Sequence, residues 1–255
     1  MYKISKLIDV SCWTGRWPFI DLRNTNFSGL EEKLKSVGVT RAFVAPLEGI
    51  LEQDPRRANK ALYQAVKNNF FSPVPIIDMS YANWKENAAA ALNDGRVLMV
   101  KLLPNYHMYG LCEVEMDSLV ALTSPRGIVV SIQTKMEDPR AQYPLMKISN
   151  VKFDEIRDTL TKFPEQNFIL NCMTFADLPE DISPYKNVYF DISCIETQDT
   201  LAAVNKKHTL ERFLFASHSP LHFPEGSVNK LKYADLGDEE IDKPAYKNAE
   251  KLFKF

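Results

Sequence analysis

The sequence lacks a charge excess, a long apolar run and a paired cysteine motif, and each absence excludes a class of protein. Its 31 Lys and Arg residues against 33 Asp and Glu residues give a formal charge of −2, which argues against a nucleic-acid footprint or a polybasic membrane surface. No apolar run reaches the roughly 18 residues of a membrane-spanning helix. The N-terminus shows no apolar stretch with a small-residue cleavage site, so we expect no secretion signal.

The four cysteines are far apart in the sequence and form no C-x-x-C pair: Cys12, Cys112, Cys172 and Cys194. Three of them lie in or beside apolar runs, so we expect reduced, mostly buried thiols in a cytoplasmic protein rather than a disulfide scaffold. No short repeat, low-complexity segment or linker interrupts the chain. With 255 residues and 45% hydrophobic content, residues 1–255 can bury a full core and are expected to form one domain.

Short apolar runs that end at a breaker are the clearest structural signal. The stretch from Arg212 to Pro220, RFLFASHSP, has the character of a strand buried on both faces. Such strands belong to parallel sheets that helices cover on both sides. His218 stands at the C-terminal edge of this strand, where α/β folds place their chemistry. A histidine that only caps a loop fits the same stretch.

The whole chain alternates such runs with helix-like segments. Strands are expected near residues 6–13, 39–47, 74–79, 96–103, 127–133, 167–172, 187–193 and 212–217. Helices are expected near residues 28–38, 55–68, 84–92, 116–122, 151–163, 197–205 and 246–253, the first with Ser28 as its N-cap. Eight strands alternating with helices over about 250 residues predict an α/β fold, a single (β/α)8 TIM barrel.

In such a barrel the polar residues at the C-terminal ends of the strands face one another across one mouth. In chain order these candidates are Trp13, Arg16, Glu48, Lys101, Tyr106, His107, Tyr109, Gln133, Arg140, Asn171, Asp191 and His218. A Lys or Asp inside an apolar strand is costly to bury unless it is paired. Lys101 and Asp191 therefore also fit a structural salt bridge, with each other or with Arg16.

Several segments together resemble the amidohydrolase-related family of metal-dependent TIM-barrel hydrolases and decarboxylases. The segments are Ile8–Val10, Gly38–Ala42, Val100–Leu102 with Tyr106–His107, Asn187–Asp191, Phe213–Pro220 and Asn248–Phe253. Their order covers nearly the whole chain. The loop Gly15–Phe19 resembles a subgroup of that family whose members are mostly uncharacterised.

The metal ligands of the family pattern are missing at three strands. The His-x-His pair of strand one is replaced by Ser11-Cys12-Trp13, the strand-six histidine by Asn171 or Cys172, and the strand-eight aspartate by His218. Tryptophan cannot ligate a metal, and serine is a poor ligand beside imidazole. We therefore expect no metal cofactor. The alternative is one divalent zinc at a site rebuilt from His107, His218 and His222 with Asp191.

The resemblance implies a mechanism that survives without metal, because some hydrolases of this family that act on lactones are understood to be metal-independent. His218 would activate water as the base and His107 would act as the partner acid. Lys101, Arg16 and Arg140 would bind or polarise an anionic substrate. Tyr106 and Tyr109 would line the pocket, or pack as a lid.

Two functions remain open from the sequence. The first is a hydrolase for a small carboxylated or carbohydrate-derived molecule; the second is a barrel that has lost catalysis and binds a metabolite or a protein partner. Convergence of His218, Lys101, Arg16 and Asp191 on one cavity would favour the enzyme. A mouth filled by Trp13 and Trp17 would favour the binder. A homo-oligomer stays open in both.

Overall fold

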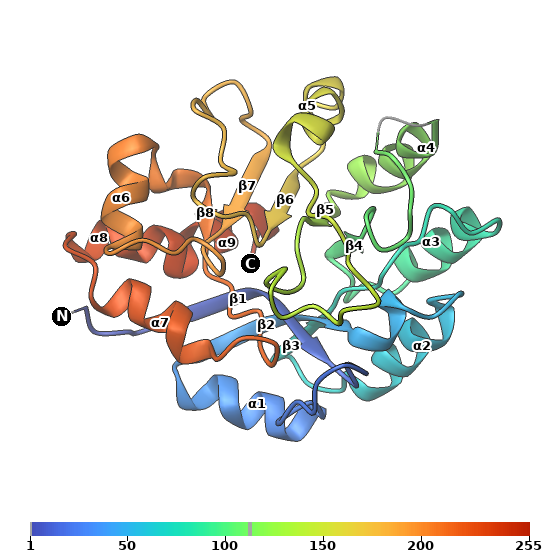
Figure 1. Cartoon of the computed structure of the whole chain (residues 1–255), viewed down its shortest axis with the longest axis horizontal. Helices are drawn as coiled ribbons and strands as arrows, with labels where there is room; N and C mark the ends of the chain where they lie inside the picture. The colour runs from blue at the N-terminus through green and yellow to red at the C-terminus, as the bar shows by residue number, and fades with distance from the viewer. Residues whose placement is uncertain (1, 112–113) are drawn as a thin grey trace.

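The computed structural model describes residues 2–111 and 114–255, and it places parallel strands at the centre with helices around them (Figure 1). The strands are β1 (Leu7–Thr14), β2 (Val39–Pro46), β3 (Phe71–Pro73), β4 (Met99–Leu102), β5 (Val129–Gln133), β6 (Phe168–Asn171), β7 (Val188–Asp191) and β8 (Phe213–Leu214). The α-helices are α1 (Phe27–Ser36), α2 (Arg56–Ala65), α3 (Trp84–Leu92), α4 (Val114–Thr123), α5 (Phe153–Lys162), α6 (Thr200–Lys207), α7 (Pro224–Lys232), α8 (Asp238–Asp242) and α9 (Asn248–Phe253). Shorter turns are η1 (Leu47–Ile50), η2 (Ser124–Arg126), η3 (Leu210–Arg212) and the π-helical η4 (Lys243–Lys247).

The strands follow one another in chain order, in a three-stranded sheet β1-β2-β3 and a five-stranded sheet β4-β5-β6-β7-β8. Individual backbone bonds span the two gaps between these sheets. Lys101 bridges Ile76 on one side, and on the other Val10 N–H donates to the Phe215 carbonyl at 3.0 Å and His218 N–H to the Ser11 carbonyl at 2.9 Å. The predicted barrel order is confirmed, while its closure depends on these bonds rather than on continuous ladders.

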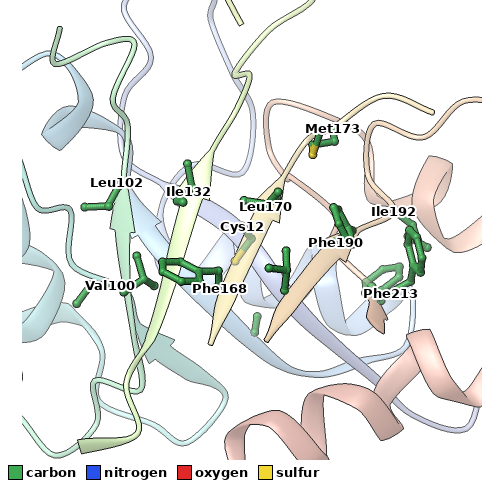
Figure 2. Packing of buried hydrophobic residues seen from close by; sticks show 14 of the residues in the cluster. Cys12, Val100, Leu102, Ile132, Phe168, Leu170, Met173, Phe190, Ile192 and Phe213 are labelled. Atoms are coloured by element: carbon green, nitrogen blue, oxygen red, sulfur yellow. The ribbon is translucent and has the colours of Figure 1, made fainter. Parts of the chain in front are cut away.

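Alternation along the strands separates two apolar layers. Leu102, Ile132, Leu170, Phe190 and Phe213 are register partners across β4 to β8 and belong to one buried cluster (Figure 2). The side chains of this outer layer pack against the helices, as expected for parallel strands buried on both faces.

The intervening residues fill the inside of the barrel. Their apolar part includes Met99, Val129, Ile169 and Leu214, all fully buried. At the N-terminal ends of the strands, Phe253 of α9 stacks on Phe43 with ring centroids 4.2 Å apart. The C-terminal helix thus closes that end, and the polar inward residues collect toward the other.

Several expected elements differ in the structure. The third strand is Phe71–Pro73 instead of 74–79. Pro75 has no N–H to donate to a neighbouring strand. The Asn59 side chain donates to the Ile76 carbonyl at 2.8 Å and accepts from the Ile76 N–H at 2.9 Å, so neither group is left for a strand partner on that side. Asn26 caps α1 in place of Ser28, since its side chain accepts from Gly29 N–H. The helix α7 was not expected.

The cysteine prediction is confirmed for three positions. Cys12, Cys172 and Cys194 are buried and have free thiols, and Cys112 lies outside the described residues. Within the part of the chain that the structure describes, no helix is both long and apolar enough to cross a membrane.

Candidate active site

A buried cation occupies the barrel axis. Lys101 is 1% exposed, and its ammonium donates to Ser11 Oγ at 3.1 Å, Gln133 Oε1 at 3.0 Å and Asn171 Oδ1 at 3.0 Å. It also lies 4.7 Å from the centroid of the Trp13 ring. Burial lowers the pKa of Lys101 to about 8, against the opposing effect of nearby acidic groups. Neutral oxygens and a ring face therefore stabilise this charge.

Asp191 joins the same network through an amide. Asn171 accepts from Lys101 with its oxygen and donates its Nδ2 to Asp191 Oδ2 at 2.7 Å. Asp191 Oδ1 accepts from the Ser193 N–H at 2.9 Å and from the Ser193 hydroxyl at 2.6 Å. Neither Lys101 nor Asp191 forms a salt bridge with any described residue, so the direct ion pair considered from the sequence is wrong.

A second buried carboxylate, missed as a site residue, is Asp9 of β1. Its Oδ1 accepts from the N–H groups of Ser11 and Ser217 at 3.1 and 3.0 Å, and its Oδ2 from the Ser217 hydroxyl at 2.5 Å. Complete burial raises the pKa of Asp9 to about 7, and these hydrogen bonds oppose the rise. The signal for Asp9 was the one used for Lys101, a charged residue inside an apolar strand.

Both ring nitrogens of His218 are already bonded. Nδ1 accepts from Trp13 Nε1–H at 3.0 Å, and Nε2 lies 3.1 Å from the Met136 carbonyl, to which it donates in the matching neutral tautomer. Burial, His222 and Lys101 lower the pKa of His218 well below its usual value. His218 reaches the axis as expected, but this geometry leaves no lone pair for water, so its role as base stays a prediction that the geometry does not favour.

An aromatic cover lies over the axis. Trp17 donates Nε1–H to Glu137 at 2.8 Å and packs against Tyr106 with ring centroids 6.3 Å apart. The Phe19 ring packs against the rings of Trp17 and Tyr143, with ring centroids 5.4 and 5.3 Å apart. Loops after β1, β4 and β5 supply these rings, so Tyr106 packs in the lid-like manner that was one alternative for it.

Five predicted residues, Arg16, Glu48, His107, Tyr109 and Arg140, lie apart from the axial network. Arg16 is exposed, and its backbone N–H donates to Glu48 at 2.7 Å, so Glu48 braces the turn after β1. Arg140 is exposed and paired with Asp138 at 2.8 Å. His107 contacts Asp78, with Nδ1 and Oδ1 3.7 Å apart, and the nearby ring of Tyr109. His107 therefore has different neighbours from His218, which contacts Trp13, Met136 and His222.

Beside the axis the loops line an open cavity of about 440 Å³. Its lining includes Lys135 and Asp138 after β5, Ser193, Cys194 and Glu196 after β7, His222 and Phe223 after β8, and Lys230 of α7. The His222 ring lies 4.8 Å from the His218 ring. Burial and the charge of Lys135 lower the pKa of His222. Sequence reasoning had placed His222 only in the alternative zinc site.

The cations of this cavity differ in their pairing. Lys230 donates to the Ser193 carbonyl at 2.7 Å and to Glu196 at 2.8 Å. The ammonium of Lys135 forms no hydrogen bond or salt bridge with any residue of 2–111 or 114–255. Lys135 is therefore the cation of the cavity that can bind an anionic ligand without breaking a contact.

The comparison with protein families decides the class. The family model for amidohydrolases matches residues 17–255. The chain belongs to the amidohydrolase family. This membership supports an enzyme of the amidohydrolase type and confirms the resemblance drawn from the sequence. A search of curated proteins found no match.

Solved structures confirm the barrel fold of this chain. An uncharacterised TIM-barrel protein from Bordetella bronchiseptica is 17% identical, with 98% of each chain covered and a TM-score of 0.69. The 2,6-dihydroxybenzoate decarboxylase from Rhizobium is 12% identical, with 98% of each chain covered and a TM-score of 0.72. A 5-carboxyvanillate decarboxylase from Novosphingobium aromaticivorans, solved with bound manganese, is also 12% identical and covers 98% of this chain and 97% of that chain, with a TM-score of 0.72.

The axial residues of this chain do not fit such a metal. Ser11, Trp13 and Asn171 stand at positions where the family pattern has imidazole, and the Lys101 ammonium is bonded to two of these three residues. A second cation placed there would be repelled by Lys101 and would find neutral amide and hydroxyl oxygens. Among the described residues no group of three or more His, Cys, Asp or Glu side chains could hold a metal ion.

Proposed function

We propose that the protein is a metal-independent amidohydrolase-type hydrolase that acts on a small carboxylated molecule in the cavity beside the barrel axis, with His222 as its acid–base group. One observation carries the proposal. His222 lines the cavity together with Lys135, whose ammonium forms no hydrogen bond or salt bridge with another described residue, whereas both nitrogens of His218 are bonded.

The cavity suits hydrolysis of an activated acyl bond. Its volume of about 440 Å³ is within the range of small-molecule sites, roughly 300–1,000 Å³. Lys135 can bind a substrate carboxylate or polarise a carbonyl. Because its pKa is lowered, His222 is neutral near pH 7 and can take a proton from an attacking water and return it to the leaving group.

The substrate class is supported by the relatives. Two of the similar structures act on carboxylated aromatic acids, 5-carboxyvanillate and 2,6-dihydroxybenzoate. A substrate panel should therefore contain aromatic acids beside lactones, esters and amides that carry a carboxylate. Loss of CO₂ from an aromatic acid would identify a decarboxylase in place of a hydrolase.

A second candidate function is a barrel that binds a metabolite without turning it over. The filled axis favours it, because Trp13 and Trp17 are 0% and 2% exposed and the axial charges are satisfied internally. Turnover separates the candidates: a panel compound that binds and is recovered unchanged would establish the binder.

The test compares three histidine variants on a compound that turns over. His222→Gln should lower kcat/KM by roughly 10²–10⁴ with an unchanged melting temperature. His208→Gln, on the loop before η3, is the matched control and should leave activity unchanged. His218→Gln should lower stability by about 1–3 kcal/mol, because Trp13 N–H and the Met136 carbonyl lose their partner. Full activity in His222→Gln would refute its role.

A further inference from the structure

The loop after β7 places a thiol in the wall of this cavity. Cys194 lines the cavity and is 6% exposed. It interacts electrostatically with the Cys172 thiol, which follows β6. Cys172 also contacts the Ser193 hydroxyl with 3.3 Å between sulfur and oxygen. The residues that follow two neighbouring strands thus carry two interacting thiols, and one of them, Cys194, lines the cavity.

The pair is held by the axial network. Asp191 accepts the Cys172 N–H at 3.2 Å, and it accepts both the N–H and the hydroxyl of Ser193. Cys172 has a φ of 61°, a left-handed conformation that is uncommon for residues other than glycine. Strain of this kind persists where surrounding contacts over-determine it and concentrates at functional sites. Asp191 therefore holds the backbone of Cys172 and the side chain of Ser193, the residue before Cys194.

The three described cysteines differ in their electrostatic surroundings. The Cys172 thiol and the Lys135 ammonium lower the pKa of Cys194 against the effect of burial. Burial raises the pKa of Cys172 and of Cys12 well above the usual value. Since the thiolate is the nucleophilic form, Cys194 is the sulfur that this environment activates. His222 lines the same cavity.

We propose that Cys194 is a nucleophile that takes an acyl group from substrates in this cavity. The proposal rests on the function proposed above and names its covalent step. The Cys194 proton passes to His222, and the sulfur bonds to the acyl carbon. Collapse of the tetrahedral adduct breaks the bond to the leaving group, which takes the proton from His222. Water then attacks the thioester, His222 receives the water proton, and that proton returns to the released sulfur.

The experiment uses p-nitrophenyl acetate as the acyl donor and needs no natural substrate. The protein carries Cys112→Ser, so that the three described cysteines are compared. Peptide mapping should find the acetyl group on Cys194, with at least tenfold less on Cys12 and Cys172, since each unit of pKa changes the thiolate fraction about tenfold. Lys135→Met should slow acetylation of Cys194 several-fold, and Lys206→Met on α6 should not. Equal acetylation of the three cysteines, or none on Cys194, would overturn the proposal.

Turnover of a panel substrate separates this step from the proposed function. Loss of turnover in both Cys194→Ser and His222→Gln supports the two together. Full turnover in Cys194→Ser with loss in His222→Gln overturns the covalent step and leaves the hydrolase standing. Acetylation of Cys194 without turnover of any panel compound overturns the hydrolase and leaves Cys194 as a cavity acylation site.

Discussion

At the residue scale, the barrel axis shows how charged groups are buried without ion pairs. Lys101 is surrounded by a hydroxyl, two amide oxygens and an aromatic face, and Asp9 and Asp191 are surrounded by hydroxyl, amide and backbone N–H donors. Burying an uncompensated charge is prohibitive, so each hydrogen bond here offsets part of a large desolvation cost. These residues are therefore sensitive to substitution and to pH.

Asp9 gives the first prediction, a fall in stability as pH rises. Its pKa is raised from 3.8 to about 7 by burial. Between pH 3.8 and about 7 the folded protein keeps a proton that the unfolded chain releases. The contribution of Asp9 to the free energy of unfolding is therefore full below about pH 4 and is lost as the pH rises to about 7. Urea unfolding of wild type relative to Asp9→Asn should show a slope of up to about 1.4 kcal/mol per pH unit across this window. Parallel curves for the two proteins would contradict the assignment.

The positions of part of the axial network could be predicted from the sequence, while the catalytic roles of its residues stay predictions. Lys101, Asp191 and Asn171 were predictable because polar residues stand out inside apolar strands and the strand period places them inward. Cys194 and His222 were not, because they follow the strands on loops whose paths no short-range pattern determines. The two hydrogen bonds of the His218 ring could not be predicted either, because their partners, Trp13 and Met136, come from other parts of the chain.

At the element scale, the differences from expectation have local causes. The unexpected helix α7 begins with Pro224, where the missing N–H costs nothing and the fixed φ suits a helix. The predicted strand over 74–79 failed because a side chain, Asn59, supplies the hydrogen bonds that a neighbouring strand would make. Such long-range substitutions do not appear in the sequence pattern of either segment.

The start of α1 gives an element-scale prediction. Asn26 accepts from Gly29 N–H at 2.8 Å, so Asn26→Ala should lower the free energy of unfolding by about 1 kcal/mol. Ser28→Ala, two residues on and inside the first turn, should change it by less than about 0.5 kcal/mol. Chemical denaturation of the two variants beside wild type checks the assignment. A larger loss in Ser28→Ala would restore Ser28 as the cap.

At the scale of the whole molecule, the barrel was predictable because the alternation of buried strands and helices is regular along the chain. The bonds that close it were not, because they join irregular segments beyond the ends of β3 and β8. The family followed from the order of several weak segments, and the family model confirms it.

The whole-molecule prediction concerns metal. Because the Lys101 ammonium occupies the axial oxygens, the purified protein should hold no stoichiometric zinc or manganese, and a chelator should leave turnover unchanged. Elemental analysis and assays with and without EDTA test this. One metal per chain, lost in Asp191→Asn or His218→Asn, would show that a metal site has been rebuilt.

The most direct test of the account is a crystal structure of the His222→Gln variant with a panel substrate bound. The account predicts the substrate in the cavity between the loops after β5, β7 and β8, its carboxylate on Lys135 and its acyl carbon facing Cys194. Trp13 and Trp17 should keep their places over Lys101. A substrate bound at the barrel axis against Lys101, with either tryptophan displaced, would contradict the account.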